Sequence, residues 1–133
     1  MTEKPKIHTL DLNIFKEDID ALGHVNNQVF LRWVQEASAS HWDTLAPDSL
    51  KSSFRWVVLR HEIDYHKPIK FQDKIFAITW VQLTMTTTSL RCVEIRKENQ
   101  LMARAITTWC LLDYITLKPK RIPEQIVKIF STL

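Results

Sequence analysis

The chain has 133 residues, 45% of them hydrophobic, which suffices for one domain with a hydrophobic core but not for two independent domains. Its 18 Lys and Arg residues are interspersed with 15 Asp and Glu residues, and the net charge of +3 fits a protein that handles an anionic ligand and an ordinary solvated surface equally well. No basic helix, aromatic stacking motif or zinc spacing favours nucleic acid as a partner, so we predict a single domain at residues 1–133 that binds none.

The first predicted element is a strand at residues 7–15, where apolar and polar side chains alternate. A polar loop at residues 16–26 breaks this alternation. Over residues 27–45 apolar side chains recur at three- and four-residue steps, which predicts an amphipathic helix of about five turns with Asn26 or Asn27 as its N-cap. The helix positions expected to face the core are Phe30, Trp33, Val34, Ala37, His41 and Leu45.

A loop is predicted at residues 46–53, and strand patterns dominate the chain beyond it. The four strands are predicted at residues 55–66, 74–84, 89–96 and 101–114, followed by a short helix at residues 123–131 with Pro123 in its first turn. Short connections between these strands favour an antiparallel meander. One long helix with a single apolar face, followed by such a sheet, predicts an α+β fold in which the sheet curls around the helix.

Signals for export or membrane insertion are not found in the sequence. No N-terminal segment combines a basic start with an apolar run, and no apolar stretch approaches the length needed to cross a bilayer. Cys92 and Cys110 lie in apolar strand-like stretches and form no CxxC pair, which indicates buried, reduced thiols. We therefore expect a cytoplasmic protein without a membrane partner.

The polar loop before the long helix holds the residues best suited to chemistry, in the order Asp18-x-Asp20-x-x-Gly23-His24-Val25-Asn26-Asn27. It delivers two carboxylates, a histidine and two asparagines to a helix N-terminus, where unpaired backbone N–H groups and the helix dipole favour negative charge. A carbonyl oxygen that becomes negative in a transition state would be stabilised there, while a carboxylate activates water or attacks the carbonyl. Gly23 is the only glycine of the chain, so we expect the loop to require its conformational freedom.

Two other interpretations of this loop compete with catalysis. Asp and Asn residues before a helix commonly serve only as caps. A metal site made of Asp18, Asp20 and His24 is a further alternative, but no additional ligand cluster with a defined spacing supports it, and we predict no metal.

The loop motif resembles the signature of hotdog-fold acyl-CoA thioesterases, in particular the 4-hydroxybenzoyl-CoA thioesterase-like group with its medium- and long-chain acyl-CoA relatives. The resemblance covers nearly the whole chain, and it continues through Phe30, Trp33, Glu36-Ala37, Tyr65-His-Lys-Pro68, Lys118-Pro119 and Arg121-Ile122-Pro123. It implies a hotdog fold, in which a curved antiparallel sheet wraps a long central helix. It also implies a homodimer, or a homotetramer built from dimers, with the thioester at the dimer interface.

The resemblance implies that the protein hydrolyses an acyl-CoA or acyl-carrier-protein thioester to a free acid and a thiol, without a cofactor. By this resemblance Asp20 acts as general base or nucleophile, and the backbone N–H of Asn27 polarises the thioester carbonyl. His24 is the third expected catalytic residue; its ring is expected to orient the loop, contact the substrate or carry a proton. The residues expected to bind the substrate are Gly23, Asn26, Glu36, Thr87, Thr88, Ser89, Lys118 and Arg121.

Departures from the family pattern bear on two of these roles. Gln35 stands where family members commonly carry Asp or Glu, which leaves Glu36 as a weaker candidate for a second carboxylate. Threonines stand at residues 86–88 where some members carry basic residues, so hydroxyl groups together with Lys118, Lys120 and Arg121 would have to bind the phosphates.

Two other functions remain open on the same fold. One is a hydratase or dehydratase, but its signature places Asp and His five residues apart with Asn-Pro between them, whereas Asp20 and His24 are four apart without either residue between them. The other is a noncatalytic acyl-CoA-binding module, against which the intact Asp20 argues.

Overall fold

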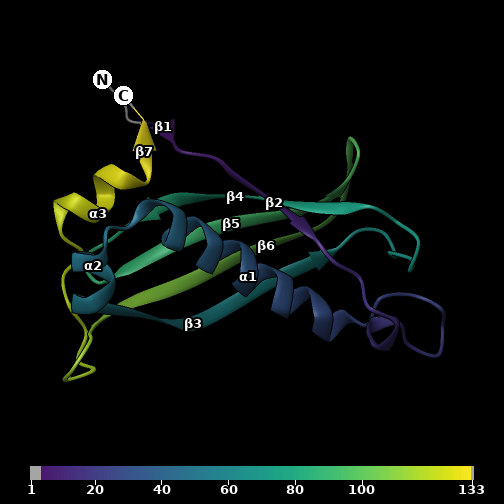
Figure 1. The fold of residues 1–133 in the computed structure, drawn as a ribbon, viewed down its shortest axis with the longest axis horizontal. Coiled ribbons are helices and arrows are strands. Elements are labelled where there is room, and N and C mark those ends of the chain that lie inside the picture. Colours follow the sequence, from purple (N-terminus) through teal and green to yellow (C-terminus); the bar gives the residue numbers. More distant parts are fainter. Residues whose placement is uncertain (1–3, 133) are drawn as a thin grey trace.

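Five strands form one antiparallel sheet in the computed structural model, which describes residues 4–132. They are β2 (His8–Leu12), β3 (Phe54–Tyr65), β4 (Ile75–Thr84), β5 (Thr88–Lys97) and β6 (Gln100–Asp113). Their order across the sheet is β2-β4-β5-β6-β3, so β2 and β3 are the two edge strands (Figure 1).

The predicted meander is correct for β4, β5 and β6 but wrong for β3. This strand pairs with β6, from Phe54 opposite Asp113 to Tyr65 opposite Ala103, and not with β4, which follows it in the chain. The connection after β3 contains Pro68, which lacks a backbone N–H and cannot continue a ladder. Residues 66–74 therefore leave the sheet, and residues 66–69 form part of the wall of a pocket at the start of the long helix.

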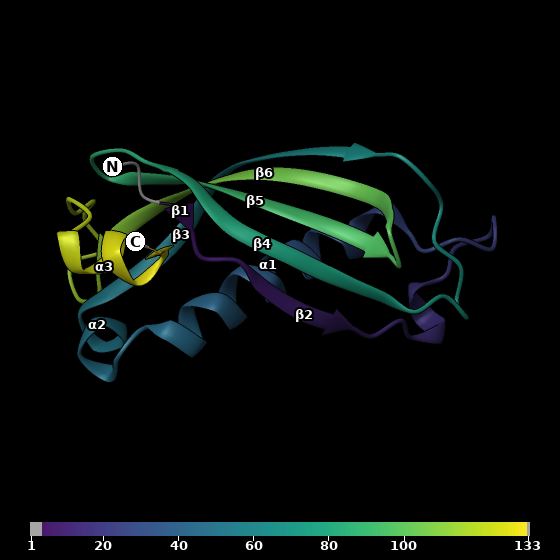
Figure 2. The ribbon, with the colours of Figure 1, turned by 90° about the horizontal axis from the view of Figure 1, so that it is seen from above.

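The long helix α1 (Asn27–Leu45) begins and ends where the sequence predicted. Asn26 is its N-cap, and its Oδ1 accepts a hydrogen bond from the N–H of Gln28 at 3.0 Å. The predicted core face is confirmed except for Leu45, which is only partly buried. Figures 1 and 2 show α1 lying across one face of the sheet, with the strands arching over it, so the predicted α+β hotdog fold is confirmed.

The chain around this framework differs from the prediction in several short elements. Helix α2 (Asp48–Ser53) occupies the predicted loop, because Leu50 is buried in a second hydrophobic cluster, separate from the main core. Pro123 is the N-cap of α3 (Glu124–Ile129) and lies just before its first turn. The remaining short elements are the 3-10 helix η1 (Lys16–Asp18) and strands β1 (Lys4–Pro5) and β7 (Ser131–Thr132), which pair with each other.

Cys92 and Cys110 are both buried and free, as predicted. None of the helices within residues 4–132 has the length and apolar character needed to span a membrane.

Candidate active site

The loop between β2 and α1 is closed by its own backbone. Ile19 and Val25 form an isolated antiparallel bridge, and the N–H of Asp20 donates to the carbonyl of His24 at 2.8 Å. The turn between them needs a left-handed residue, and Gly23 supplies it with φ of +80°. A Cβ at Gly23 would meet no atom within 4 Å, so the requirement is one of backbone conformation and not of space.

The two carboxylate oxygens of Asp20 differ in their hydrogen bonding. Its Oδ1 accepts the backbone N–H groups of Leu22 at 2.9 Å and of His24 at 3.4 Å, which stabilises the turn. Its Oδ2 forms no hydrogen bond with any residue in the range 4–132. The side chain is half-buried. One oxygen is thus fixed by the loop, and the other is free to accept a proton or to attack a carbon atom.

Among the backbone N–H groups of residues 25–28, only that of Asn27 has no hydrogen-bond acceptor within residues 4–132. The N–H groups of Val25, Asn26 and Gln28 have acceptors at 2.7, 2.8 and 3.0 Å. The N–H of Asn27 has no acceptor within residues 4–132, as expected for the first residue of a helix. This N–H lies at the positive end of the α1 dipole and can donate to an oxyanion.

Asp20 and Asn27 line the same pocket, which has a volume of about 400 Å³. Its opposite wall is formed by residues 65–69. The hydroxyl of Tyr65 donates to the carbonyl of Asn27 at 3.3 Å, and its ring meets the edge of Phe30 with centroids 5.1 Å apart. Tyr65 was not among the expected site residues, although its segment belonged to the family pattern.

His24 lines the pocket and Glu36 does not. His24 lines the pocket, but its backbone, and not its ring, makes the hydrogen bonds to Asp20; among residues 4–132 the ring has no hydrogen-bond partner. Glu36 lies on α1 outside this pocket, is half exposed, and pairs with Arg32 at 3.5 Å. Gly23 lies in the loop without lining the pocket, and Asn26 lines it.

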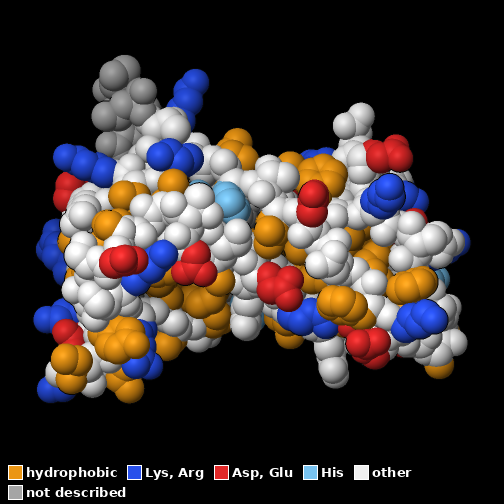
Figure 3. All heavy atoms as spheres, viewed as in Figure 1, with side chains coloured by type: hydrophobic (Ala, Val, Ile, Leu, Met, Phe, Trp, Pro, Cys, Tyr) orange, Lys and Arg blue, Asp and Glu red, His pale blue; other side chains and the backbone are white. Residues whose placement is uncertain are grey.

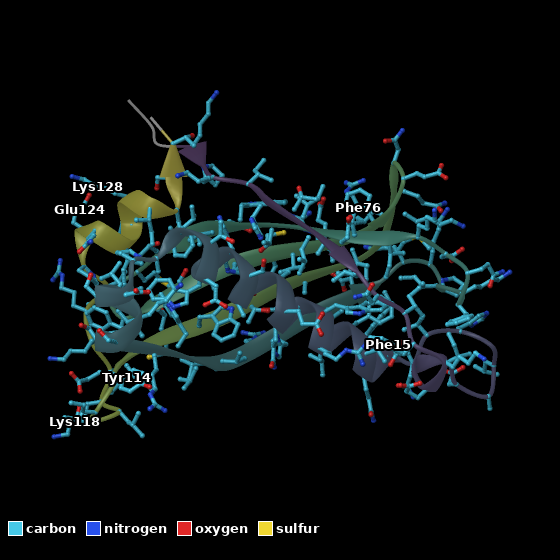
Figure 4. The ribbon with its side chains drawn as sticks, in the orientation of Figure 1. Phe15, Phe76, Tyr114, Lys118, Glu124 and Lys128 are labelled. Atoms are coloured by element: carbon cyan, nitrogen blue, oxygen red, sulfur yellow. The ribbon has the colours of Figure 1, made fainter. Side chains whose placement is uncertain are left out.

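The other expected substrate-binding residues lie at the opposite end of the protomer. Figure 4 places Lys118 far from Phe15, which immediately precedes the loop of Asp20. Backbone hydrogen bonds from Leu111 to Thr87 and from Ile122 to Thr86 hold the turn between β4 and β5 at that far end. Within one protomer the residues not brought to the Asp20 pocket are therefore Thr87, Thr88, Ser89, Lys118 and Arg121.

Asp18, the first carboxylate of the motif, has a structural environment. It is 3% exposed, and the guanidinium of Arg32 binds both of its oxygens at 3.0 and 2.8 Å. The N–H of Phe15 donates to the same carboxylate at 2.9 Å. These bonds, that from Arg32 foremost, hold the pKa of Asp18 below its ordinary value despite burial. Asp18 thus joins the loop to α1 and leaves no oxygen free for catalysis.

Replacing Asp18 by Asn is expected to lower the free energy of unfolding by about 1 to 3 kcal/mol while most of the enzymatic turnover remains, because the change removes a buried charged acceptor. Since the native pKa is lowered, this stabilisation is present above the unfolded value of about 3.9 and is lost as the pH falls through the native pKa. Denaturant unfolding of both proteins at pH 7 and near pH 3 should show the difference shrinking in acid. Glu36→Gln, which removes only the exposed partner of Arg32, is the control and should change stability by less than about 0.5 kcal/mol.

Comparison with known proteins assigns the family of the chain. A sequence model of the acyl-ACP thioesterase N-terminal domain matches residues 5–130. The chain belongs to the acyl-ACP thioesterase family. The expected hotdog thioesterase is confirmed, although the matching family is named for acyl-ACP and not for acyl-CoA substrates. No curated protein matches the chain in sequence.

Three of the similar solved structures share the fold of this thioesterase over at least nine tenths of their length. A predicted thioesterase from Bacillus stearothermophilus has a TM-score of 0.84 at 20% identity, with 94% of each chain covered. A thioesterase from Thermus thermophilus, complexed with coenzyme A and Zn, has a TM-score of 0.81 at 26% identity, covering 92% of this chain and 90% of the other. A 1,4-dihydroxy-2-naphthoyl-CoA thioesterase from Synechocystis has a TM-score of 0.78 at 20% identity, covering 94% and 96%. Within residues 4–132 no cluster of three or more His, Cys, Asp or Glu side chains could hold a metal ion.

Proposed function

We propose that this thioesterase hydrolyses an acyl-CoA or acyl-carrier-protein thioester, with Asp20 as the reacting carboxylate and the Asn27 N–H as the oxyanion donor. The observation that carries the proposal is the pairing of a free carboxylate oxygen, Asp20 Oδ2, with a free backbone donor in one pocket. Hydrolysis of a thioester needs both groups: one to deliver the nucleophile and one to stabilise the negative oxygen.

The chemistry follows from these two groups. With Asp20 as general base, its Oδ2 takes a proton from water as the water oxygen bonds to the thioester carbon, and the carbonyl oxygen becomes an oxyanion beside Asn27. Collapse of this intermediate breaks the carbon–sulfur bond, and the thiolate leaves with a proton. With Asp20 as nucleophile, Oδ2 bonds to the carbon, the thiolate leaves, and water then hydrolyses the acyl anhydride.

A panel of acyl-CoA and acyl-carrier-protein thioesters, assayed for release of free thiol, tests this function. We expect turnover of at least one acyl chain, and the ratio of kcat/KM between the two carriers identifies the thiol end that the enzyme binds. An enoyl-CoA hydration assay runs beside it. Hydration without thiol release would make the protein a hydratase, and binding without either reaction would make it a noncatalytic module.

We further propose that two protomers pair through β3, which would complete the site. The free edge of this 12-residue strand carries exposed Val57 and Leu59, an aggregation hazard that pairing would remove. The Tyr65 end of β3 lies at the Asp20 pocket, and the Phe54 end lies beside β6 at Asp113, near Lys118. Antiparallel pairing across a two-fold axis would therefore bring Lys118 of the partner subunit toward Asp20, together with the other expected substrate-binding residues at that end of the partner. The two buried thiols fit the reducing cytoplasm in which we expect the enzyme to act.

Sedimentation of the wild-type protein is expected to give at least twice the mass of one chain. Leu59→Lys should shift it toward the monomer and lower its activity, because a charge would replace an apolar side chain at the paired edge. Leu83→Lys is the control and should leave the assembly unchanged, because Leu83 is also exposed (50%, against 60% for Leu59) but lies on the inner strand β4. A stable, fully active wild-type monomer would contradict the shared site.

A further inference from the structure

A second cavity, of about 380 Å³, lies between the C-terminal half of α1 and strands β3, β4, β5 and β6. Three tryptophans, Trp42, Trp56 and Trp109, form much of its wall together with Phe130. It shares no lining residue with the Asp20 pocket. Hydrophobic side chains gather between α1 and β3 on the face shown in Figure 3. Ser89, one of the expected substrate-binding residues, lines this cavity, but the proposed hydrolysis gives no role to its aromatic interior.

A buried cation faces this apolar cavity. Arg91 of β5 lines it and is only 5% exposed. Its Nη1 donates to His41 Nδ1 at 2.9 Å and to Thr79 Oγ1 at 3.1 Å, and its guanidinium lies 5.1 Å from the ring centroid of Phe130. No Asp or Glu within residues 4–132 forms an ion pair with Arg91.

The groups that bind Arg91 do not neutralise it. Burial, reinforced by the Arg91 charge, lowers the pKa of His41 to about 3, so this histidine is neutral at physiological pH. Burial also lowers the pKa of Arg91 to about 10, which still leaves the guanidinium charged at pH 7. An isolated charge in an apolar interior is costly unless a counter-ion accompanies it.

Arg91 also retains unused hydrogen-bonding capacity. A guanidinium has five N–H donors, and the two bonds of Nη1 leave those on Nε and Nη2 without a partner in the range 4–132. The Nε1 donor of Trp109, another cavity residue, is likewise buried without an acceptor in this range. Neighbouring N–H groups on one planar guanidinium match the two oxygens of a carboxylate.

We propose that the second cavity binds an apolar carboxylic acid, with its carboxylate on the free N–H groups of Arg91 and its hydrocarbon part against the tryptophans. A cavity of this volume lies within the range of about 300 to 1,000 Å³ that small-molecule sites occupy. One buried cation inside aromatic walls, with Arg55 only at the exposed rim, suits a carboxylate on a hydrocarbon better than a strongly hydrated phosphate, which would lose its water without gaining enough polar contacts.

Two ligands share this chemistry: a free fatty or aryl acid, and an acyl group that carries a second carboxylate at its distal end. The second source rests on the proposed thioesterase dimer. The rim of the cavity includes exposed residues Ala39 of α1 and Arg55 of β3, so it would lie beside the strand that we propose to pair. An acyl group held at Asp20 of the partner subunit would then approach this cavity.

Titration of the full chain with decanoate and with 1-decanol, both below their aggregation concentrations, tests the site through tryptophan fluorescence. The wild-type protein is expected to bind decanoate at least about tenfold more tightly than the alcohol, and Arg91→Met should abolish this difference while preserving the affinity for 1-decanol. Lys128→Met is the matched control, since Lys128 lies on α3 near Phe130 but its side chain points outward (Figure 4). It should bind like the wild type.

Equal affinities of the wild-type protein for the acid and the alcohol would overturn the proposal, as would unchanged decanoate binding by folded Arg91→Met. The wild-type comparison needs no substitution, and Arg91→Lys, which keeps the charge but not the planar fork, should show a partial loss if Arg91→Met does not fold.

Hydrolysis of decanoyl-CoA and of 9-carboxynonanoyl-CoA by wild type and Arg91→Met identifies the ligand. If Arg91→Met lowers kcat/KM for the carboxyacyl substrate alone, the ligand is an acyl group with a distal carboxylate. If the variant loses decanoate binding but hydrolyses both thioesters at wild-type rates, the ligand is a free acid. Should the wild type hydrolyse no thioester of the acyl-CoA and acyl-carrier-protein panel, the proposed function fails, and the decanoate titration still decides the site.

Discussion

Asp20→Asn is expected to lower kcat at least about 100-fold with little change in KM, because it removes the proton acceptor and leaves the loop intact. The hydrogen bonds of Asp20 explain why the loop should stay intact and KM should change little. Only Oδ1 of Asp20 is used by the loop, through the N–H groups of Leu22 and His24, and the amide oxygen of Asn can accept the same two bonds. The oxygen that is lost is the free one. Steady-state kinetics on the best thioester of the panel measure the change.

The matched control is Asp18→Asn, which alters the other carboxylate of the same motif. Because both oxygens of Asp18 are bound by Arg32, this variant should lose stability and keep most of its turnover. Equal kinetic losses in the two variants would mean that the loop, and not the Asp20 carboxylate, supports activity. Wild-type turnover in Asp20→Asn would refute the assignment directly.

A single turnover in ¹⁸O-labelled water tests the nucleophilic role of Asp20, because only that role can place ¹⁸O in its side chain. A nucleophilic carboxylate forms an acyl anhydride, and if water attacks its Asp20 carbonyl, ¹⁸O enters the side chain. A general base never bonds to the acyl carbon, so its oxygens remain unlabelled. Mass spectrometry of the peptide that contains Asp20 reads the outcome.

The parts of the fold that could be predicted from sequence are those set by local interactions. Asn26 caps α1 through a bond to a residue two positions away, and Gly23 adopts a positive φ within its own turn. Both requirements are visible in a short stretch of sequence. The place of β3 depends instead on pairing with β6, about 50 residues further along the chain, which no local pattern encodes.

The same distinction explains which site residues could be identified. Residue types alone do not separate Asp18 from Asp20, which only the family resemblance distinguished, because the pairing that occupies Asp18 comes from Arg32 on the helix. Similarly, the placement of Lys118 at the end opposite the loop follows from the sheet topology. Arg91 was missed for a different reason: the alternation of β5 puts it on the inner face, where a charged side chain is rarely found.

Asn27→Pro should remove about 2.7 to 4 kcal/mol of transition-state stabilisation, a loss of roughly 100- to 1,000-fold in kcat, because proline has no N–H to donate to the oxyanion. The substitution suits the site. Asn27 is the first residue of α1, where proline is favoured, and Asn26 before it has φ of −61° and ψ of 139°, the extended conformation that a following proline requires. The N-cap bond to Gln28 does not involve the Asn27 N–H and should persist.

The control for this prediction is Asn27→Ala, which keeps the N–H and removes only the side chain, and which should turn over like the wild type. Circular dichroism and thermal unfolding verify that Asn27→Pro is folded. Unchanged kcat in the folded proline variant would assign the oxyanion donor to Asn26 or Gln28. Each of those N–H groups would first have to release its present acceptor, Asp18 for Asn26 and the cap oxygen for Gln28, whereas the N–H of Asn27 has none to release within the described chain. The Asn27 N–H can donate to the oxyanion without breaking an existing hydrogen bond. We therefore expect the proline substitution at Asn27, and not a change at its neighbours, to abolish most of the catalysis.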